Sequence, residues 1–284
     1  MRNIVLIPCW RRDDFLSLTL EYIRQSEDAE KYLYVFLLDY GHSRSVANIV
    51  SSFPLDKRIK SLKTRYYRGN SANLMEGYKE AMAMTEPEGS ELVYLIEEDI
   101  FVGKDFFIFH ENVHKKFDCH FVSGVRNQND KPKSSGNVEK DLSLVYPHNS
   151  YQSCGISWKK SGLEFIIPHS NEMYYRHMSD YVKRNFPNSK MSPIHWPEQD
   201  GLIYRIVEKY NLIGLYPYVA RAYHAGFVGY NRRGIPLVGD LNKRINQLKS
   251  MKKDDMNKRA LTYKDIEPCD LGDRGVREFE MEMM

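Results

Sequence analysis

The sequence predicts an α/β fold with a mostly parallel central sheet. Three stretches, 4–7, 32–38 and 92–96, are continuous apolar runs, which is the pattern of strands buried on both faces. Between them, 13–25 and 71–84 carry apolar residues at helical spacing. Strands that alternate with helices in this way form parallel sheets covered by helices. With 284 residues, the chain is long enough for one large domain or two small ones.

The first two β–α units have clear boundaries in the sequence. Pro8 closes the first strand, and Asp13 or Asp14 starts the helix after it. The second strand ends in Asp39 and leads through a polar turn into a short helix that reaches about residue 52. These two units predict the first part of the parallel sheet.

The later elements are less regular. A third strand is predicted at 60–67, and the fourth strand, 92–96, runs straight into three acidic residues. Beyond residue 107 the alternation weakens. The pattern then predicts, in order, a strand at 121–125, a polar loop at 127–138, short β pieces and loops to about 170, helices at 173–184 and 199–210, and a strand at 212–219.

The composition excludes several classes of protein. Hydrophobic residues make up 42% of the chain and charged residues 28%, so neither disorder nor a fibrous repeat fits. The four cysteines, Cys9, Cys119, Cys154 and Cys269, form no CxxC pair and are too sparse for a disulfide framework. The apolar stretch at 4–10 is too short for a signal peptide or a membrane span. A soluble protein in a reducing compartment, the cytoplasm, is expected.

Acidic residues follow two of the predicted strands. Asp39 ends the second strand, and Glu97-Glu98-Asp99 follows the fourth. In open α/β sheets, ligands bind outside the carboxyl ends of the strands. Three consecutive acids repel one another, and a divalent cation with a polar ligand would relieve that repulsion. The alternative is a solvated loop after an edge strand, which the apolar segments on both sides disfavour.

The loop after the first strand holds Trp10-Arg11-Arg12 in place of a glycine-rich motif. The chain lacks both GxxxxGK[ST] and a GxGxxG after a strand, which argues against a P-loop NTPase and a dinucleotide-dependent dehydrogenase. Arginine forks suit a diphosphate, and the indole would cover a base. A solvent-facing helix start with a packed tryptophan is the alternative.

Taken in order, these segments resemble the GT-A glycosyltransferases. ELVYLIEEDIFVGKDFF at 91–107 is similar to their metal-site segment, closest to the N-acetylglucosaminyltransferase I and protein-O-mannose N-acetylglucosaminyltransferase family. IPCWRRDDFLSLTLEYI, VFLLDYG, YYRGNSANLMEGYKEAM and RAYHAGFVG also match, within residues 4–230. The resemblance implies a GT-A catalytic domain at 1–235, with a donor half to about 125 and an acceptor half beyond it. A basic helical extension and acidic tail would follow at 236–284.

The resemblance also implies an activity and a donor site. A sugar, N-acetylglucosamine, would pass with inversion from a UDP-sugar, assisted by Mn²⁺ or Mg²⁺. Asp99 would bind the metal that bridges to the diphosphate, Glu98 would contact the ribose, and Glu97 would contact a hydroxyl of the transferred sugar. Asp39 would read the nucleoside. The other residues placed on the donor are Pro8, Arg11, Arg12, Tyr66 and Arg68.

An inverting transferase needs a carboxylate base on the face opposite the leaving group. HWPEQD at 195–200 resembles the acceptor-side motif of the family, which favours Asp200 as the base and Glu198 as the alternative. Both acids would also suit the first turn of a helix without any catalytic role. The neighbours of Asp200 are not the aromatic residues usual in the family, so the identity of the base stays open.

Other side chains are candidates for the metal and the acceptor. His224 lies where many GT-A enzymes place a histidine near the metal or diphosphate, although a satisfied buried donor is the alternative. A stacking role for Trp158 competes with a place in the core. Cys154 is expected to be a buried small residue, since nothing identifies a paired base. The residues placed on the acceptor are Trp158, Trp196, Arg205, Arg232 and Arg233.

The net charge of +3 hides an uneven distribution. Residues 221–259 hold ten Lys or Arg and three Asp or Glu. The last 25 residues reverse this balance, with three Lys or Arg and seven Asp or Glu. A basic surface suits a phosphate backbone. The acceptor prediction therefore leans to a hydroxymethylated pyrimidine in DNA, the acceptor of viral DNA glycosyltransferases, which would have to be flipped out of the duplex. Such a viral protein would act in the host cytoplasm.

Alternatives remain at each level of this prediction. A surface-glycan or lipid-linked precursor is the rival acceptor. The alternative for the basic run is a solvated basic helix with no binding function. Nucleotidyl transfer shares the sheet and the acidic ligands, but it usually needs a glycine-rich loop after the first strand. A non-catalytic protein that binds nucleotide-sugars or DNA would not depend on Asp200.

Overall fold

The computed structural model describes residues 2–61, 69–125, 137–148, 151–191 and 197–224. Its strands and helices, in chain order, are β1 (Ile4–Cys9), α1 (Asp13–Gln25), β2 (Leu33–Leu38), α2 (Arg44–Ser52), β3 (Lys57–Ser61), α3 (Gly69–Glu88), β4 (Leu92–Leu95), β5 (Ile100–Val102), α4 (Phe106–Lys116), β6 (Phe121–Ser123), α5 (Val138–Ser143), β7 (Val145–His148), β8 (Ile156–Lys159), α6 (Lys160–Ile166), α7 (Glu172–Arg176), α8 (Met178–Asn185), α9 (Gln199–Tyr210), β9 (Gly214–Pro217) and β10 (Ala222–His224). Within these residues no helix has the length and apolar character that crossing a membrane requires.

The central sheet has the strand order β3-β2-β1-β4-β8-β6-β9-β7. β1 to β4 are parallel, β8 is antiparallel to both of its neighbours, β6 and β9 are parallel, and β7 closes the edge antiparallel to β9. β5 and β10 form a separate antiparallel ribbon. The predicted α/β class with a mostly parallel central sheet is confirmed.

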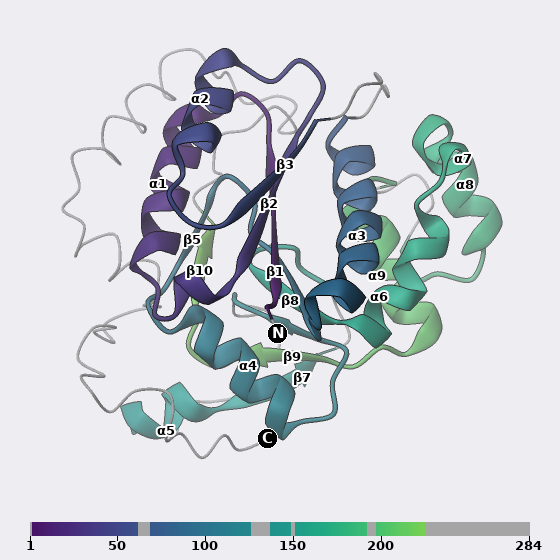
Figure 1. Cartoon of the computed structure of the whole chain (residues 1–284). Helices are drawn as coiled ribbons and strands as arrows, with labels where there is room; N and C mark the ends of the chain where they lie inside the picture. Colours follow the sequence, from purple (N-terminus) through teal and green to yellow (C-terminus); the bar gives the residue numbers. More distant parts are fainter. Residues whose placement is uncertain (1, 62–68, 126–136, 149–150, 192–196, 225–284) are drawn as a thin grey trace, which may run out of the picture.

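Helices cover both faces of the sheet (Figure 1). α1 and α2 lie on one side, and α3, α6 and α9 lie on the other. Side chains of β1 alternate between the two layers: Val5 and Ile7 join the core under α1, while Ile4 and Leu6 join the core under α3. All four are fully buried, and each contributes about 1.5–3 kcal/mol of hydrophobic stabilisation.

Pro8 lies inside the first strand, which the sequence had predicted to end there. It pairs with Leu37 of β2 within β1. The carbonyl of Leu6 accepts from Ile96, so every second residue of β1, Pro8 included, points its backbone toward β4. Pairing between β1 and β4 ends at Leu6 and Leu95. Proline therefore costs no ladder hydrogen bond at this position.

Other boundaries also differ from the predictions. β3 begins earlier than predicted, because Lys57 pairs with Tyr34; its described part reaches Ser61, and the rest of the predicted strand lies outside the described residues. The helix predicted at 173–184 is two helices, α7 and α8, which meet at His177. α4 was missed because its first turn, Phe106 to Phe109, is apolar on every side and shows no helical period. α5 and α6, each seven residues or fewer, replace part of the predicted loops and β pieces.

Candidate functional site

The candidate site lies where the strand order reverses. The chain moves outward from β1 through β2 to β3, and β4 then returns to the other side of β1. In doubly wound sheets, ligands bind outside the carboxyl ends of the strands at this point. The loop that follows β1 and the acidic triplet that follows β4 both occupy it.

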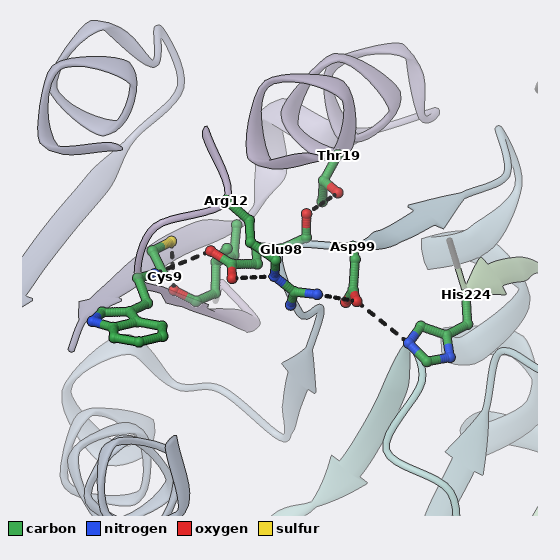
Figure 2. A network of polar contacts seen from close by, with 8 residues as sticks. Cys9, Arg12, Thr19, Glu98, Asp99 and His224 are labelled. Atoms are coloured by element: carbon green, nitrogen blue, oxygen red, sulfur yellow. Dashed lines mark hydrogen bonds and ion pairs between the residues drawn. The ribbon is translucent and has the colours of Figure 1, made fainter. Parts of the chain in front are cut away.

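Arg12 joins the two loops (Figure 2). Its Nε donates to Glu98 Oε1 and its Nη1 donates to Asp99 Oδ2, both at 2.6 Å. Both carboxylates are buried, and the Arg12 side chain is 22% exposed. Arg12 stands at the N-cap position of α1, where its carbonyl accepts from Leu16. The helix start therefore fixes the backbone of Arg12 and leaves the side chain to reach the carboxylates.

Glu98 holds the loop after β1 with both of its oxygens. Oε1 accepts from Arg12, and Oε2 accepts from the backbone N–H of Trp10 at 3.0 Å. Thr19 of α1 donates to the carbonyl of Glu98 at 2.9 Å. The predicted ribose contact of Glu98 would have to share one of these bonds, so the geometry assigns Glu98 first to positioning Trp10 and Arg12.

The loops after β1 and β2 also bind each other. The indole Nε1 of Trp10 donates to the Tyr40 carbonyl at 3.1 Å, and Arg11 Nε donates to the Gly41 carbonyl at 2.8 Å. The Arg11 guanidinium lies 4.9 Å from the centre of the Trp10 ring. Asp39 is buried and accepts from the Tyr40 N–H, and burial raises the pKa of its carboxyl. An indole and an exposed guanidinium thus lie against the loop that follows the buried Asp39 carboxylate.

His224 approaches the acidic triplet from the other side. β10 pairs with β5 so that His224 lies opposite Ile100, and its Nε2 is 3.4 Å from Asp99 Oδ2. Although partial enclosure lowers the pKa of His224, hydrogen bonds to Asp99 and Cys154 raise it to about 11. Burial raises the pKa of Asp99, but His224 and Arg12 outweigh it and hold that pKa below its ordinary value.

Arg221 fixes the start of the β10 strand. It is 1% exposed, and its Nε donates to Asp105 Oδ2 at 2.7 Å. Its other nitrogens donate to the carbonyls of Val219 and Leu142. Arg221 was not among the predicted site residues, although it opens the RAYHAGFVG match and directly precedes β10, which was the available signal.

Asp200 faces the same triplet from the first turn of α9. Two hydrogen bonds tie this helix start to α3: Ser71 Oγ donates to Gln199 Oε1 at 2.7 Å and accepts from the Gln199 N–H at 3.2 Å. Asp200 stays open to solvent, yet the protein around it displaces bulk water and raises the pKa of its carboxyl. Glu198 stands half-buried at the N-cap position.

Ser153 lies between Asp200 and Glu97. Its hydroxyl lies near both carboxylates, and a hydrogen bond from its single proton to either one lowers the pKa of that carboxyl. Burial first, and then the charges of Asp200 and Asp99, raise the pKa of Glu97 well above its ordinary value. Cys154, next in sequence, contacts His224, so a histidine partner exists that the sequence did not reveal; burial raises the pKa of the thiol and keeps it protonated.

Two predicted acceptor contacts are wrong. Trp158 is fully buried against Phe121 and Tyr151, where no acceptor reaches its ring. Arg205 is also fully buried, and its Nη1 donates to the Gly201 carbonyl one turn earlier in α9, at 2.7 Å. Both predictions failed because a core residue and a site residue look alike in sequence when the helix or strand on which they lie is buried.

The remaining predicted residues fall into two groups. Pro8 is buried in β1, next to the site but inside the sheet. Five predicted residues lie outside the described parts of the chain, namely Tyr66, Arg68, Trp196, Arg232 and Arg233.

Asp99 and His224 could hold a divalent cation as two protein ligands, with the imidazole of His224 losing its proton as the metal binds. Metal–ligand distances of roughly 2.0–2.2 Å put neighbouring ligands about 3 Å apart, and His224 Nε2 and Asp99 Oδ2 are 3.4 Å apart. Across the described parts of the chain, no three His, Cys, Asp or Glu side chains are arranged to hold a metal ion. Phosphate oxygens and water would complete the shell, as is usual for Mg²⁺.

Comparisons with known proteins show only distant likeness. No protein-family model and no curated protein sequence matches this chain. Residues 1–349 of S. aureus TarS are 12% identical, with a TM-score of 0.44 over 58% of this chain and 48% of that one. The Pyrobaculum calidifontis mannosyltransferase PcManGT, solved with GDP-Man and Mn²⁺, is 15% identical, with a TM-score of 0.42 over 57% and 46%. A Leptospira borgpetersenii cytidylyltransferase is 12% identical, with a TM-score of 0.39 over 65% and 72%.

This chain thus spans about half the length of the first two structures. Fold and site define the class of protein to which it belongs: an α/β protein with a charged site at the switch point of its sheet.

Proposed function

We propose that this chain is a GT-A glycosyltransferase that moves a sugar from a nucleoside diphosphate sugar to an acceptor hydroxyl. The donor is a UDP-sugar, with N-acetylglucosamine as the sugar and Mn²⁺ or Mg²⁺ as the cofactor, and the configuration inverts. One observation supports this most. In the acidic triplet after β4, Asp99 interacts with Arg12 and His224, while Glu97 lies close enough to Asp200 for its charge to raise the pKa of Glu97. A cation-and-diphosphate side and a base side therefore share one strand end.

On the donor side, Asp99 and His224 would hold the cation, which neutralises the charge that builds on the leaving diphosphate when bound. Arg11 and Arg12 offer N–H donors that suit phosphate oxygens. The Trp10 indole lies beside Arg11, and both bind the loop that follows Asp39, where a base and its N–H groups would be recognised.

On the acceptor side, Asp200 takes the proton of the attacking hydroxyl. The hydroxyl oxygen forms a bond to the anomeric carbon while the bond from that carbon to the diphosphate breaks, and the leaving diphosphate keeps the electron pair. A raised pKa makes a carboxylate a better base, and the pKa of Asp200 is raised. Glu198 is the alternative base, because it stands two residues away on the same helix start.

The acceptor we propose is a hydroxymethylated pyrimidine in DNA, with a glycan or lipid-linked precursor as the rival. The proposal depends on the basic run at 221–259, most of which lies outside the described residues. Acidic Glu97 and Asp200 at the base side favour a neutral hydroxyl there, so the phosphates of DNA would have to bind elsewhere.

The test is incubation of the full chain with Mn²⁺ and labelled UDP-sugars, with hydroxymethylcytosine DNA or glycan acceptors. UDP release and label on one acceptor are expected, and Asp200→Asn should bind UDP normally but transfer nothing. Pyrophosphate release from UTP and a sugar phosphate, with UDP-sugars left intact, would instead identify a nucleotidyltransferase.

A further inference from the structure

Arg12 occupies the carboxylate oxygen that a cation would need. Its Nη1 donates to Asp99 Oδ2 at 2.6 Å, and the same oxygen lies 3.4 Å from His224 Nε2 (Figure 2). A guanidinium stays charged at every physiological pH. A metal ion that enters alone must therefore displace a permanent positive charge from Asp99.

The displaced guanidinium would lose one of the two carboxylates that balance its charge. Arg12 is mostly buried, and leaving a buried charge without its partner is strongly unfavourable. Near Arg12 the described residues hold Glu98 and Asp99 as its carboxylate partners. A metal ion alone takes one of these partners and offers no replacement, whereas a nucleoside diphosphate brings new oxygens to which the arginine can donate.

The side chain can change partners while its backbone stays in place. The guanidinium is a rigid planar fork, so Nε and Nη1 move together, and rotation about the bonds before Nε carries Nη1 away from Asp99. The α1 start holds the backbone. Only the side chain of Arg12 has to move for Asp99 to be released.

We propose that Arg12 couples cation binding to donor binding: its tip pairs with Asp99 in the donor-free protein and moves to the diphosphate when nucleotide and cation enter together. This inference rests on the proposed function. Its consequence is cooperative binding at the site: the cation binds weakly alone and tightly with a nucleoside diphosphate. Linkage requires that the cation strengthen nucleotide binding by the same factor.

The experiment measures Mn²⁺ binding to the full chain from the electron paramagnetic resonance signal of free Mn²⁺, with and without UDP. Association of Mn²⁺ with UDP in buffer is measured separately and subtracted. For the wild type, UDP is expected to tighten Mn²⁺ binding by about 5- to 150-fold. For Arg12→Gln, Mn²⁺ alone should bind about tenfold tighter, and the gain from UDP should shrink to about threefold or less.

Arg24→Gln is the matched control, because it removes one positive charge from the exposed side of the same helix. It should leave both affinities unchanged. If Arg12→Gln binds Mn²⁺ alone no tighter than the wild type does, the proposal is overturned. If neither UDP nor another nucleoside diphosphate binds the wild type in the presence of Mn²⁺, the proposed function fails instead.

Arg12→Lys keeps the proposal testable if Arg12→Gln does not fold, as judged by its melting temperature. A lysine presents one ammonium in place of a two-pronged fork, so it cannot hold Glu98 and Asp99 in the same way. Mn²⁺ alone should then bind more tightly than it binds the wild type. Equal affinity in a folded Arg12→Lys protein would overturn the proposal.

Discussion

Arg221→Met should destabilise the protein by about 3–5 kcal/mol, the usual cost of breaking a buried ion pair. The substitution leaves Asp105 buried and charged without its guanidinium, which lies 2.7 Å away at 1% exposure. The carbonyls of Val219 and Leu142 also lose their donor. Because Arg221 directly precedes β10, we expect Mn²⁺ affinity to fall as well, through the loosened position of His224.

Urea denaturation at pH 7, followed by fluorescence, measures this free energy. Adding Asp105→Leu to Arg221→Met should recover most of the loss, because no uncompensated charge then remains. The control is Arg176→Met, which breaks an exposed pair with Glu172 and should cost less than about 1 kcal/mol. A loss below about 1 kcal/mol for Arg221→Met, or no recovery in the double variant, would refute the reasoning.

Three further predictions concern the base, the pH dependence of stability and a close backbone contact. Asp200→Asn should lower transfer by about 10²- to 10⁴-fold with UDP affinity unchanged; a larger loss in Glu198→Gln, measured by the same label assay, would make Glu198 the base. Burial lowers the pKa of His114 from 6.5 to about 3, so the unfolded chain binds one more proton between these values. The free energy of unfolding should therefore decrease as the pH is lowered through that window, by up to about 1.4 kcal/mol per pH unit. Urea denaturation at several pH values should show a smaller change of this free energy per pH unit for His114→Gln; an unchanged pH dependence contradicts this. Gly124→Ala should lower the melting temperature, because the new Cβ would lie 2.6 Å from the Gly155 carbonyl oxygen; an unchanged melting temperature would mean that the two loops separate easily.

The sheet could be predicted from sequence where local patterns determine it. The apolar runs of β1, β2 and β4 are buried on both faces, and this burial is what makes such runs visible. α1 and α9 have the predicted bounds because each has one apolar side and a clear start. The acids after β2 and β4 were singled out because carboxyl ends of parallel strands meet at one edge.

The contacts within the site could not be predicted, because they join segments far apart in the chain. That Glu98 uses both oxygens on the loop after β1 depends on how β1 and β4 pair. The place of Ser153 between Glu97 and Asp200 depends on β8 entering the sheet antiparallel beside β4. The burial of Trp158 also depends on long-range pairing: its strand, β8, lies in the interior of the sheet, so the ring belongs to the core.

The central claim is that the switch-point site binds a nucleoside diphosphate through Asp99. Isothermal titration of UDP into the full chain with Mn²⁺ tests it most directly, with Asp99→Asn and Mn²⁺-free buffer as comparisons. The account predicts one bound UDP per chain, with binding weakened about 5- to 150-fold when either Mn²⁺ or the Asp99 carboxylate is removed. Equal UDP affinity in all three titrations, or no binding in any of them, would contradict it.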